Sequence, residues 1–179
     1  MYKKASAGIF LVCFLIIIIW LLQAAFRPAV LPLGAHMPAL EYHSSKGVKH
    51  LAPDSSYSTI VVHFHSLCKY CKYQLNLFNE NLHSFNDVKM IILTTEKNFL
   101  RSDKTNMWPE LEIAQNVMWG EVDPNHFENR FGSRAVPYVF IFDQFGRLLS
   151  KIRGEAKLDK ILKELNKTGG PERRVSGHN

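Results

Sequence analysis

Cys68 and Cys71 form the motif with the clearest chemistry in this chain, two cysteines separated by Lys69 and Tyr70. Two thiols at this spacing can close a small, reversible disulfide. The strand-like run Thr59–His65 precedes the pair, and a helix-like pattern starts at Lys69. At the first turn of a helix, unpaired N–H groups and the helix dipole favour a thiolate over a thiol. Because the thiolate is the attacking species in thiol–disulfide exchange, we predict Cys68 as the nucleophile and Cys71 as the resolving thiol.

The order of the apolar segments predicts a mixed central sheet flanked by helices. The expected strands are Leu40–His43, Val48–Leu51, Thr59–His65, Val88–Leu93, Asn116–Trp119, Val136–Phe142 and Leu148–Arg153, and the expected helices are Lys69–Ser84, Asp123–Phe131 and Glu155–Asn166. Parallel strands come first, and an antiparallel hairpin ends the sheet. The segment Lys97–Gln115 is ambiguous, since Trp108-Pro109 should interrupt any helix there.

An apolar run near the N-terminus predicts a membrane anchor. The 22 residues Ala5–Phe26 are interrupted only by Ser6, Gly8 and Gln23. As a helix they would span roughly 33 Å, enough for a bilayer core. Lys3 and Lys4 precede the run, so the N-terminus is expected in the cytoplasm and the rest of the chain outside it. A cleaved signal peptide is the alternative, but no convincing small-x-small cleavage site follows.

Length and composition predict one domain with flanking segments in a chain of 179 residues. We expect an anchor over residues 1–26, a linker over 27–38, a domain over 39–167 and a disordered tail over 168–179. The formal net charge of +6 is scattered and accompanies no nucleic-acid-binding motif, so nucleic acid is not an expected partner. Cys13 lies in the anchor, which leaves a single pair outside it. Such a pair indicates redox function rather than a structural disulfide, which remains the alternative.

A second segment extends the pattern 66 residues after Cys71. Phe131–Pro137 resembles the thioredoxin-superfamily segment that reads aromatic-Gly-x-Arg-x-(Ile/Val)-Pro, and Phe140–Asp143 with Gly146 matches the closing hairpin of that family. The resemblance covers about residues 38–166 and implies an α/β, thioredoxin-like fold. The anchor and the insertion near residues 96–119 look most like the membrane-tethered TlpA/ResA type.

The resemblance implies a thiol–disulfide oxidoreductase acting on protein thiols and disulfides, with a reductive direction. It implies a cis Pro137 facing the cysteines, so that the Val136 backbone can pair with an extended substrate. Lys69 and Tyr70 would tune the redox potential and contact substrate. The redox-active Cys68–Cys71 disulfide would be the only cofactor, and a membrane or periplasmic protein would donate electrons. The domain would face the periplasm or exterior from a bacterial cytoplasmic membrane.

This sequence also departs from the family pattern. Leu67 replaces the usual Trp before the first cysteine, and Val62 stands where many members carry a buried acid or Asn. The proton acceptor is therefore unassigned, and His63 and His65 are the nearest candidates.

Two other function classes fit parts of the pattern. A metal site for Cu(I) or Zn could use four side chains, His63, His65, Cys68 and Cys71. However, the histidines lie on the expected strand and Cys71 on the expected helix. A metal site would also leave the Pro137 segment unexplained. We therefore expect no metal. A peroxidase would carry Thr or Ser three residues before its attacking cysteine; His65 stands there, so we expect negligible peroxide turnover.

Overall fold

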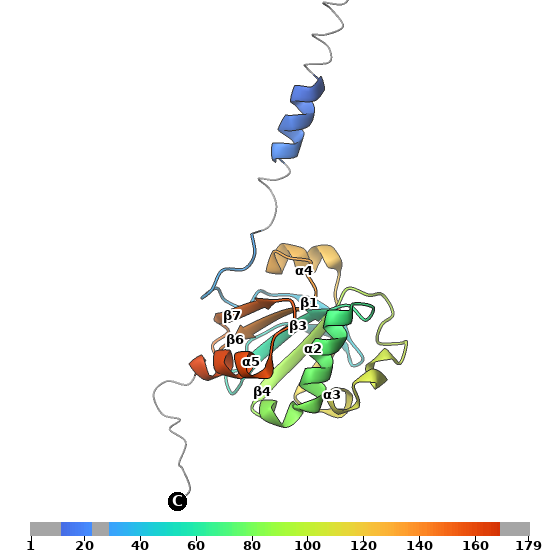
Figure 1. Ribbon diagram of the computed structural model, residues 1–179, viewed down its shortest axis with the longest axis vertical. Helices are drawn as coiled ribbons and strands as arrows, with labels where there is room; N and C mark the ends of the chain where they lie inside the picture. Colours follow the sequence, from blue (N-terminus) through green and yellow to red (C-terminus); the bar gives the residue numbers. More distant parts are fainter. Residues whose placement is uncertain (1–11, 23–28, 169–179) are drawn as a thin grey trace, which may run out of the picture.

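A mixed sheet of seven strands, in the order β2-β1-β5-β4-β3-β6-β7, organises the described part of the chain (Figure 1). The computed structural model describes residues 12–22 and 29–168. The strands are β1 (Glu41–Ser44), β2 (Gly47–His50), β3 (Ser58–Phe64), β4 (Val88–Thr94), β5 (Val117–Glu121), β6 (Tyr138–Phe142) and β7 (Leu148–Arg153). β3, β4 and β5 are parallel, whereas β6 and β7 are antiparallel. The predicted mixed sheet with a closing hairpin is confirmed.

Helices cover both faces of the sheet, and the sheet separates two hydrophobic cores. They are α2 (Lys69–Glu80), α3 (Pro109–Ile113), α4 (Pro124–Phe131) and α5 (Leu158–Leu165), with short 3-10 turns η1 (Leu82–Phe85), η2 (Lys104–Met107) and η3 (Asn166–Thr168). α2, α3 and α5 share one core through Leu75, Leu111 and Ile161. α4 supplies Phe127 and Phe131 to the core on the opposite face. The ambiguous segment contains η2 and α3, and Pro109 begins α3.

β3 lies in the interior of the sheet, between β4 and β6, and its side chains are apolar on both faces. Ile60 and Val62 pack into the core under α2, and Val61 packs into the core under α4. This alternation is the two-residue period of a strand. β3 ends at Phe64, one residue earlier than predicted, so His65 belongs to the turn that leads into α2.

An aromatic cluster fixes the insertion between β4 and β5 against the end of β3. The ring of Trp108 lies 6.0 Å from that of Phe64 and 5.8 Å from that of Trp119. The indole N–H of Trp108 donates to Asn76 Oδ1 on α2 at 2.8 Å. Phe99 adds a fourth ring, 5.2 Å from Phe64. The insertion is therefore anchored both to the end of β3 and to α2.

Residues 29–38, for which the composition predicts a linker, are hydrogen-bonded to the domain. The N–H of Leu31 donates to the carbonyl of Phe131 at 3.2 Å, and further backbone bonds join this segment to the β6–β7 hairpin. Gly132 ends α4 with φ of 70°. A Cβ there would overlap the backbone of Ala29, so this close approach requires glycine.

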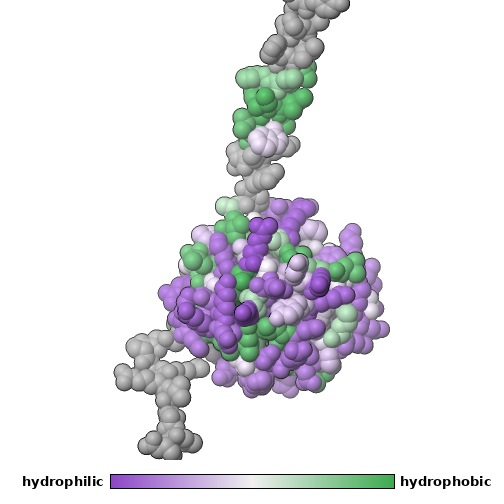
Figure 2. Space-filling model, in the orientation of Figure 1, coloured by the Kyte–Doolittle hydropathy of each residue, from purple (hydrophilic) through white to green (hydrophobic). Residues whose placement is uncertain are grey.

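The N-terminal residues 12–22 are helical, and their apolar side chains are exposed (Figure 2). The visible face of the domain is mostly hydrophilic by contrast. Among the described residues, no helix is both long and apolar enough to cross a membrane. The remainder of the predicted anchor, residues 1–11 and 23–26, and the predicted tail beyond residue 168 lie outside the described residues.

Candidate active site

Cys68 is the N-cap residue of α2, as the sequence predicts. Its backbone is extended, with φ of −77° and ψ of 119°, and its Sγ accepts a hydrogen bond from the N–H of Cys71 at 3.4 Å. The sulfur thus takes the place of the oxygen that usually caps a helix. Cys68 is half-buried and is a free thiol in this structure. Its sulfur is held at the positive end of a helix while part of the residue faces solvent.

Cys71 lies one turn into α2 and is only 1% exposed. Its Sγ accepts a hydrogen bond from the N–H of His65 at 3.4 Å. Burial, followed by the hydrogen bond with Cys68, raises the pKa of the Cys71 thiol to about 12. Cys71 therefore holds its proton in the reduced pair, and the more accessible Cys68 is the sulfur that a second molecule can reach.

The Val136–Pro137 segment faces the thiol pair across the end of the sheet. The peptide bond between these residues is cis, as the family resemblance implies. The carbonyl oxygen of Val136 lies 4.0 Å from Cys68 Sγ. A backbone hydrogen bond fixes the segment to the residue that follows β7, because the N–H of Gly154 donates to the carbonyl of Pro137 at 2.8 Å. A backbone carbonyl is thus fixed beside the sulfur.

His63 does not lie beside the cysteines, which corrects the expectation that it could serve as their proton acceptor. It lies on the α4 side of β3, stacked on Phe127 with ring centroids 4.0 Å apart. Cys71 is in the core on the other face. The expectation failed because it paired His63 with His65 on one face, whereas the strand ends before His65. The Nδ1 of His63 donates to the carbonyl of Ala135 at 3.0 Å, so the residue supports the Val136 segment instead.

Protonation of His63 is expected to destabilise the fold at acid pH. Burial lowers the pKa of His63 from 6.5 to about 4, and Nε2 has no hydrogen-bond partner within the described residues. Between pH 6.5 and pH 4 the unfolded chain binds a proton at His63 that the folded chain does not. The stability that neutral His63 contributes is therefore fully present above pH 6.5 and is lost as the pH falls toward 4. We expect the free energy of unfolding to lose about 3 kcal/mol over that range, measured by urea titration.

The matched control is His63→Asn, which keeps an N–H donor near the Nδ1 position and cannot titrate. The difference in unfolding free energy between pH 7.5 and pH 4 should be about 3 kcal/mol smaller in this variant. Equal pH dependence in the two proteins would exclude His63 as the titrating group.

The other three predicted residues surround the pair as expected from their positions in the chain. His65 is partly exposed, and its Nδ1 accepts from the N–H of Leu67 at 3.2 Å. Lys69 and Tyr70 are exposed on the first turn of α2, with Tyr70 at 59%. These side chains are available to a molecule that approaches Cys68.

Glu96 also belongs to the site, although nothing in the sequence around the cysteines predicts it. It follows the end of β4 and accepts hydrogen bonds from both the N–H and the hydroxyl of Ser66, the second at 2.7 Å. Burial raises the pKa of Glu96, but the bonds from Ser66 and Lys104 outweigh it and hold the pKa below its usual range. A sequence signal existed: β3 and β4 are parallel neighbours, so the residues after both strands meet at one edge of the sheet.

The four side chains of the alternative metal site do not lie together in the structure. His63 lies on one face of the sheet and Cys71 on the other. Within the described parts of the chain, no group of three His, Cys, Asp or Glu side chains is placed to hold a metal ion.

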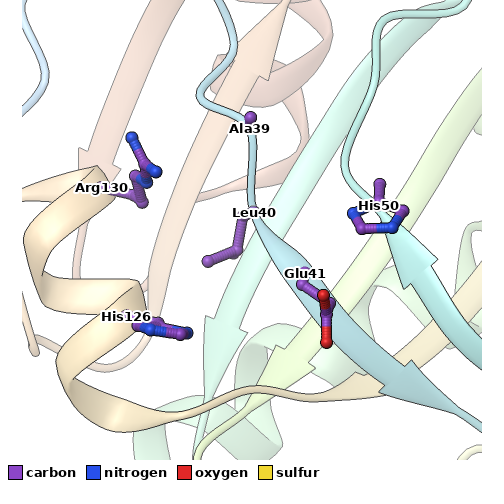
Figure 3. Close-up of a pocket in the computed structure, with 6 residues that line it drawn as sticks. All are labelled: Ala39, Leu40, Glu41, His50, His126 and Arg130. Carbon is purple, nitrogen blue, oxygen red and sulfur yellow. The ribbon is translucent and has the colours of Figure 1, made fainter.

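A separate hollow of about 220 Å³ lies between α4 and the start of β1 (Figure 3). Its polar lining consists of His126 and Arg130 from α4 on one side and Glu41 and His50 from β1 and β2 on the other. Neither cysteine of the pair lines it, so this hollow is not part of the thiol site.

Comparison with known proteins identifies the fold. No family model matches the sequence, and no curated protein matches it. A peroxiredoxin-like protein from Aquifex aeolicus has a TM-score of 0.65 at 14% identity, covering 79% of this chain and 90% of its own. A thio-disulfide isomerase from Thermus thermophilus has 0.60 at 17% identity, covering 77% and 97%. StoA from Bacillus subtilis has 0.54 at 14% identity, covering 73% and 98%. The fold is therefore thioredoxin-like.

Proposed function

We propose that this chain is a protein thiol–disulfide oxidoreductase that uses Cys68 and Cys71 as its exchanging pair. One observation carries the proposal: an accessible sulfur caps a helix, with a buried thiol one turn behind it and the Val136 carbonyl 4.0 Å away. That arrangement provides a nucleophile, a resolving group and a backbone contact for a substrate. Among similar solved structures, the Thermus thermophilus protein is named a thio-disulfide isomerase, which agrees with this reaction class.

The reaction proceeds by two successive exchanges. The Cys68 thiolate attacks one sulfur of a substrate disulfide, forms a mixed disulfide and releases the second substrate sulfur as a thiolate, which takes up a proton. Cys71 then loses its proton and attacks Cys68 Sγ, which closes the Cys68–Cys71 disulfide and releases the first substrate sulfur. The substrate gains two electrons and the pair loses two. A dithiol protein, in the membrane or the periplasm, returns them by the reverse exchange.

The surroundings of Cys68 favour an extended protein segment as the substrate. The carbonyl of Val136 can accept an N–H from such a segment and align its sulfur with Cys68. Leu67 and Tyr70 are 79% and 59% exposed beside the cysteine and can contact apolar side chains of the substrate. Lys69, exposed between them, can contact its polar groups.

The proposed direction is reductive, as the resemblance to the membrane-tethered TlpA/ResA type implies. A dithiol is a strong oxidant when its reduced form is stabilised, as in DsbA. The glutathione equilibrium of the Cys68–Cys71 pair therefore tests the direction: a reductant should hold the pair largely as the disulfide.

The exposed apolar helix of residues 12–22 supports attachment to a membrane. With the lysines that precede the apolar run, the proposed location is the outer side of a bacterial cytoplasmic membrane, with a single span. Protein substrates in the periplasm or at the cell exterior follow from that placement.

Trapping in cells tests the reaction and the location together. In Cys71→Ala, the second exchange cannot occur, so substrates should accumulate as disulfide-linked adducts of Cys68, most of them extracytoplasmic proteins. The adducts are read by non-reducing electrophoresis and mass spectrometry, with Cys13→Ser in every variant.

The control is Cys68→Ala combined with Cys71→Ala, which should carry no adducts. Equal adducts in the control would refute the role of Cys68, and adducts formed only with cytoplasmic proteins would refute the location.

A further inference from the structure

Glu96 holds the turn that carries Cys68. Both oxygens of its carboxylate are used: the N–H of Ser66 donates to Oε1, and the Ser66 hydroxyl donates to Oε2 at 2.7 Å. The turn then continues to the nucleophile, because the N–H of Cys68 donates to the carbonyl of His65 at 3.1 Å. The Glu96 side chain is only 11% exposed. A nearly buried carboxylate is thus bonded on both oxygens to a residue two positions before Cys68.

The carboxylate is itself fixed by its neighbours. Lys104 Nζ lies 3.2 Å from Glu96 Oε2 and 3.3 Å from the hydroxyl oxygen of Ser66. The N–H of Glu96 donates to the hydroxyl oxygen of Thr94 at 3.2 Å, which fixes the start of the loop. His65 Nδ1 lies 3.6 Å from Oε1. Lys104 belongs to η2 in the insertion, so the insertion is connected to the cysteine turn through this carboxylate.

We propose that Glu96 is a positioning residue for the thiol pair: it fixes the Ser66–Cys68 turn and, with Lys104, sets the local charge that the reduced pair experiences. This inference rests on the proposed function. A negative charge near the sulfurs disfavours a thiolate and so favours the disulfide, while a positive charge does the opposite. Removing Glu96 or Lys104 should therefore shift the thiol–disulfide equilibrium in opposite directions.

The experiment measures the equilibrium between the Cys68–Cys71 disulfide and glutathione in the full-length protein at pH 7. In Glu96→Gln, which keeps the size of the side chain, the equilibrium should shift about threefold or more toward the dithiol. In Lys104→Met it should shift toward the disulfide. Combining Ser66→Ala with Glu96→Gln should add little to the effect of Glu96→Gln alone, because both changes remove the same contact.

Glu121, the last residue of β5, provides a matched control because its carboxylate contacts the same insertion. Its carboxylate also accepts two backbone N–H groups, from Asn98 at 3.1 Å and Leu100 at 2.8 Å. Among the described residues, it makes no hydrogen bond to the turn that carries Cys68. Glu121→Gln should leave the glutathione equilibrium within about 1.5-fold of the wild type. This variant reports what simple loosening of the insertion does.

The inference is overturned if Glu96→Gln leaves the equilibrium unchanged, if Glu121→Gln shifts it as much, or if Lys104→Met shifts it in the same direction as Glu96→Gln. If Glu96→Gln folds poorly, the shift of the glutathione equilibrium in Lys104→Met still tests the inference, because it should be toward the disulfide. Failure of the proposed function is a different result: the trapping experiment would yield no adducts through Cys68, although the glutathione equilibrium would still respond to both variants.

Discussion

Replacing Cys68 with serine is expected to lower the rate of protein-disulfide reduction by at least about 10³-fold. A serine hydroxyl does not ionise near neutral pH and cannot form a mixed disulfide, so the first exchange is lost entirely. The fold should remain, because the serine oxygen can accept the N–H of Cys71 in place of the sulfur. The free energy of unfolding should change by less than about 0.5 kcal/mol. The rate is measured as reduction of insulin by a regenerating dithiol.

The comparison for this variant is Cys13→Ser, which removes the cysteine outside the pair and should retain the wild-type rate. Retention of the wild-type rate by Cys68→Ser would show that this thiol is not the nucleophile. Loss of the fold, seen in the urea titration, would appear as a change in stability and can be separated from loss of chemistry.

Replacing Trp108 with alanine is expected to lower the free energy of unfolding by about 3–5 kcal/mol. Trp108 is 1% exposed and packs against the rings of Phe64 and Trp119. The substitution leaves a cavity in the aromatic cluster and removes the hydrogen bond to Asn76. Because the cluster lies at the end of β3, the same loss should loosen the start of α2. Urea unfolding measures the change.

Met107 provides the neighbouring control, since it is 46% exposed. Met107→Ala should change the free energy of unfolding by less than about 0.5 kcal/mol. Trp108→Phe keeps most of the packing but not the indole N–H. Its decrease in the free energy of unfolding should lie between those of Trp108→Ala and Met107→Ala. A Trp108→Ala protein as stable as Met107→Ala would mean that the insertion does not stabilise the domain.

The spacing of apolar residues and the positions of helix-capping residues in the sequence predict most of the fold. The apolar run that forms β3 and the helical spacing of Cys71, Leu75 and Phe78 each follow from burial on a defined face. Asp123 caps α4 through bonds to Asn125 and His126, as a capping residue before proline predicts. These features are local, so the sequence alone carries them.

The contacts between distant segments could not be predicted in the same way. Glu96 meets Ser66 only because β4 lies beside β3 in parallel register, with Thr94 opposite Phe64. His63 shares a face of β3 with Val61, as the two-residue period predicts, but the sequence does not show that α4 rather than α2 covers that face. The orientation of His65 depends on where β3 ends, because a shift of one residue at a strand end reverses the side to which the next residue points. The position of the Val136 carbonyl was expected from the family resemblance, and residue spacing alone would not have indicated it.

The docked segment of residues 29–38 has a further consequence for how far the thiols can travel. Because it is bonded to the domain, only the six residues 23–28 separate the helical residues 12–22 from the docked chain. Covalent geometry limits that span to about 25 Å. Under the proposed anchoring, the domain therefore works as a tethered reagent confined to a thin layer above the bilayer. A partner held in the same layer would meet it at a high effective concentration, whereas a soluble partner would have to diffuse to the surface first.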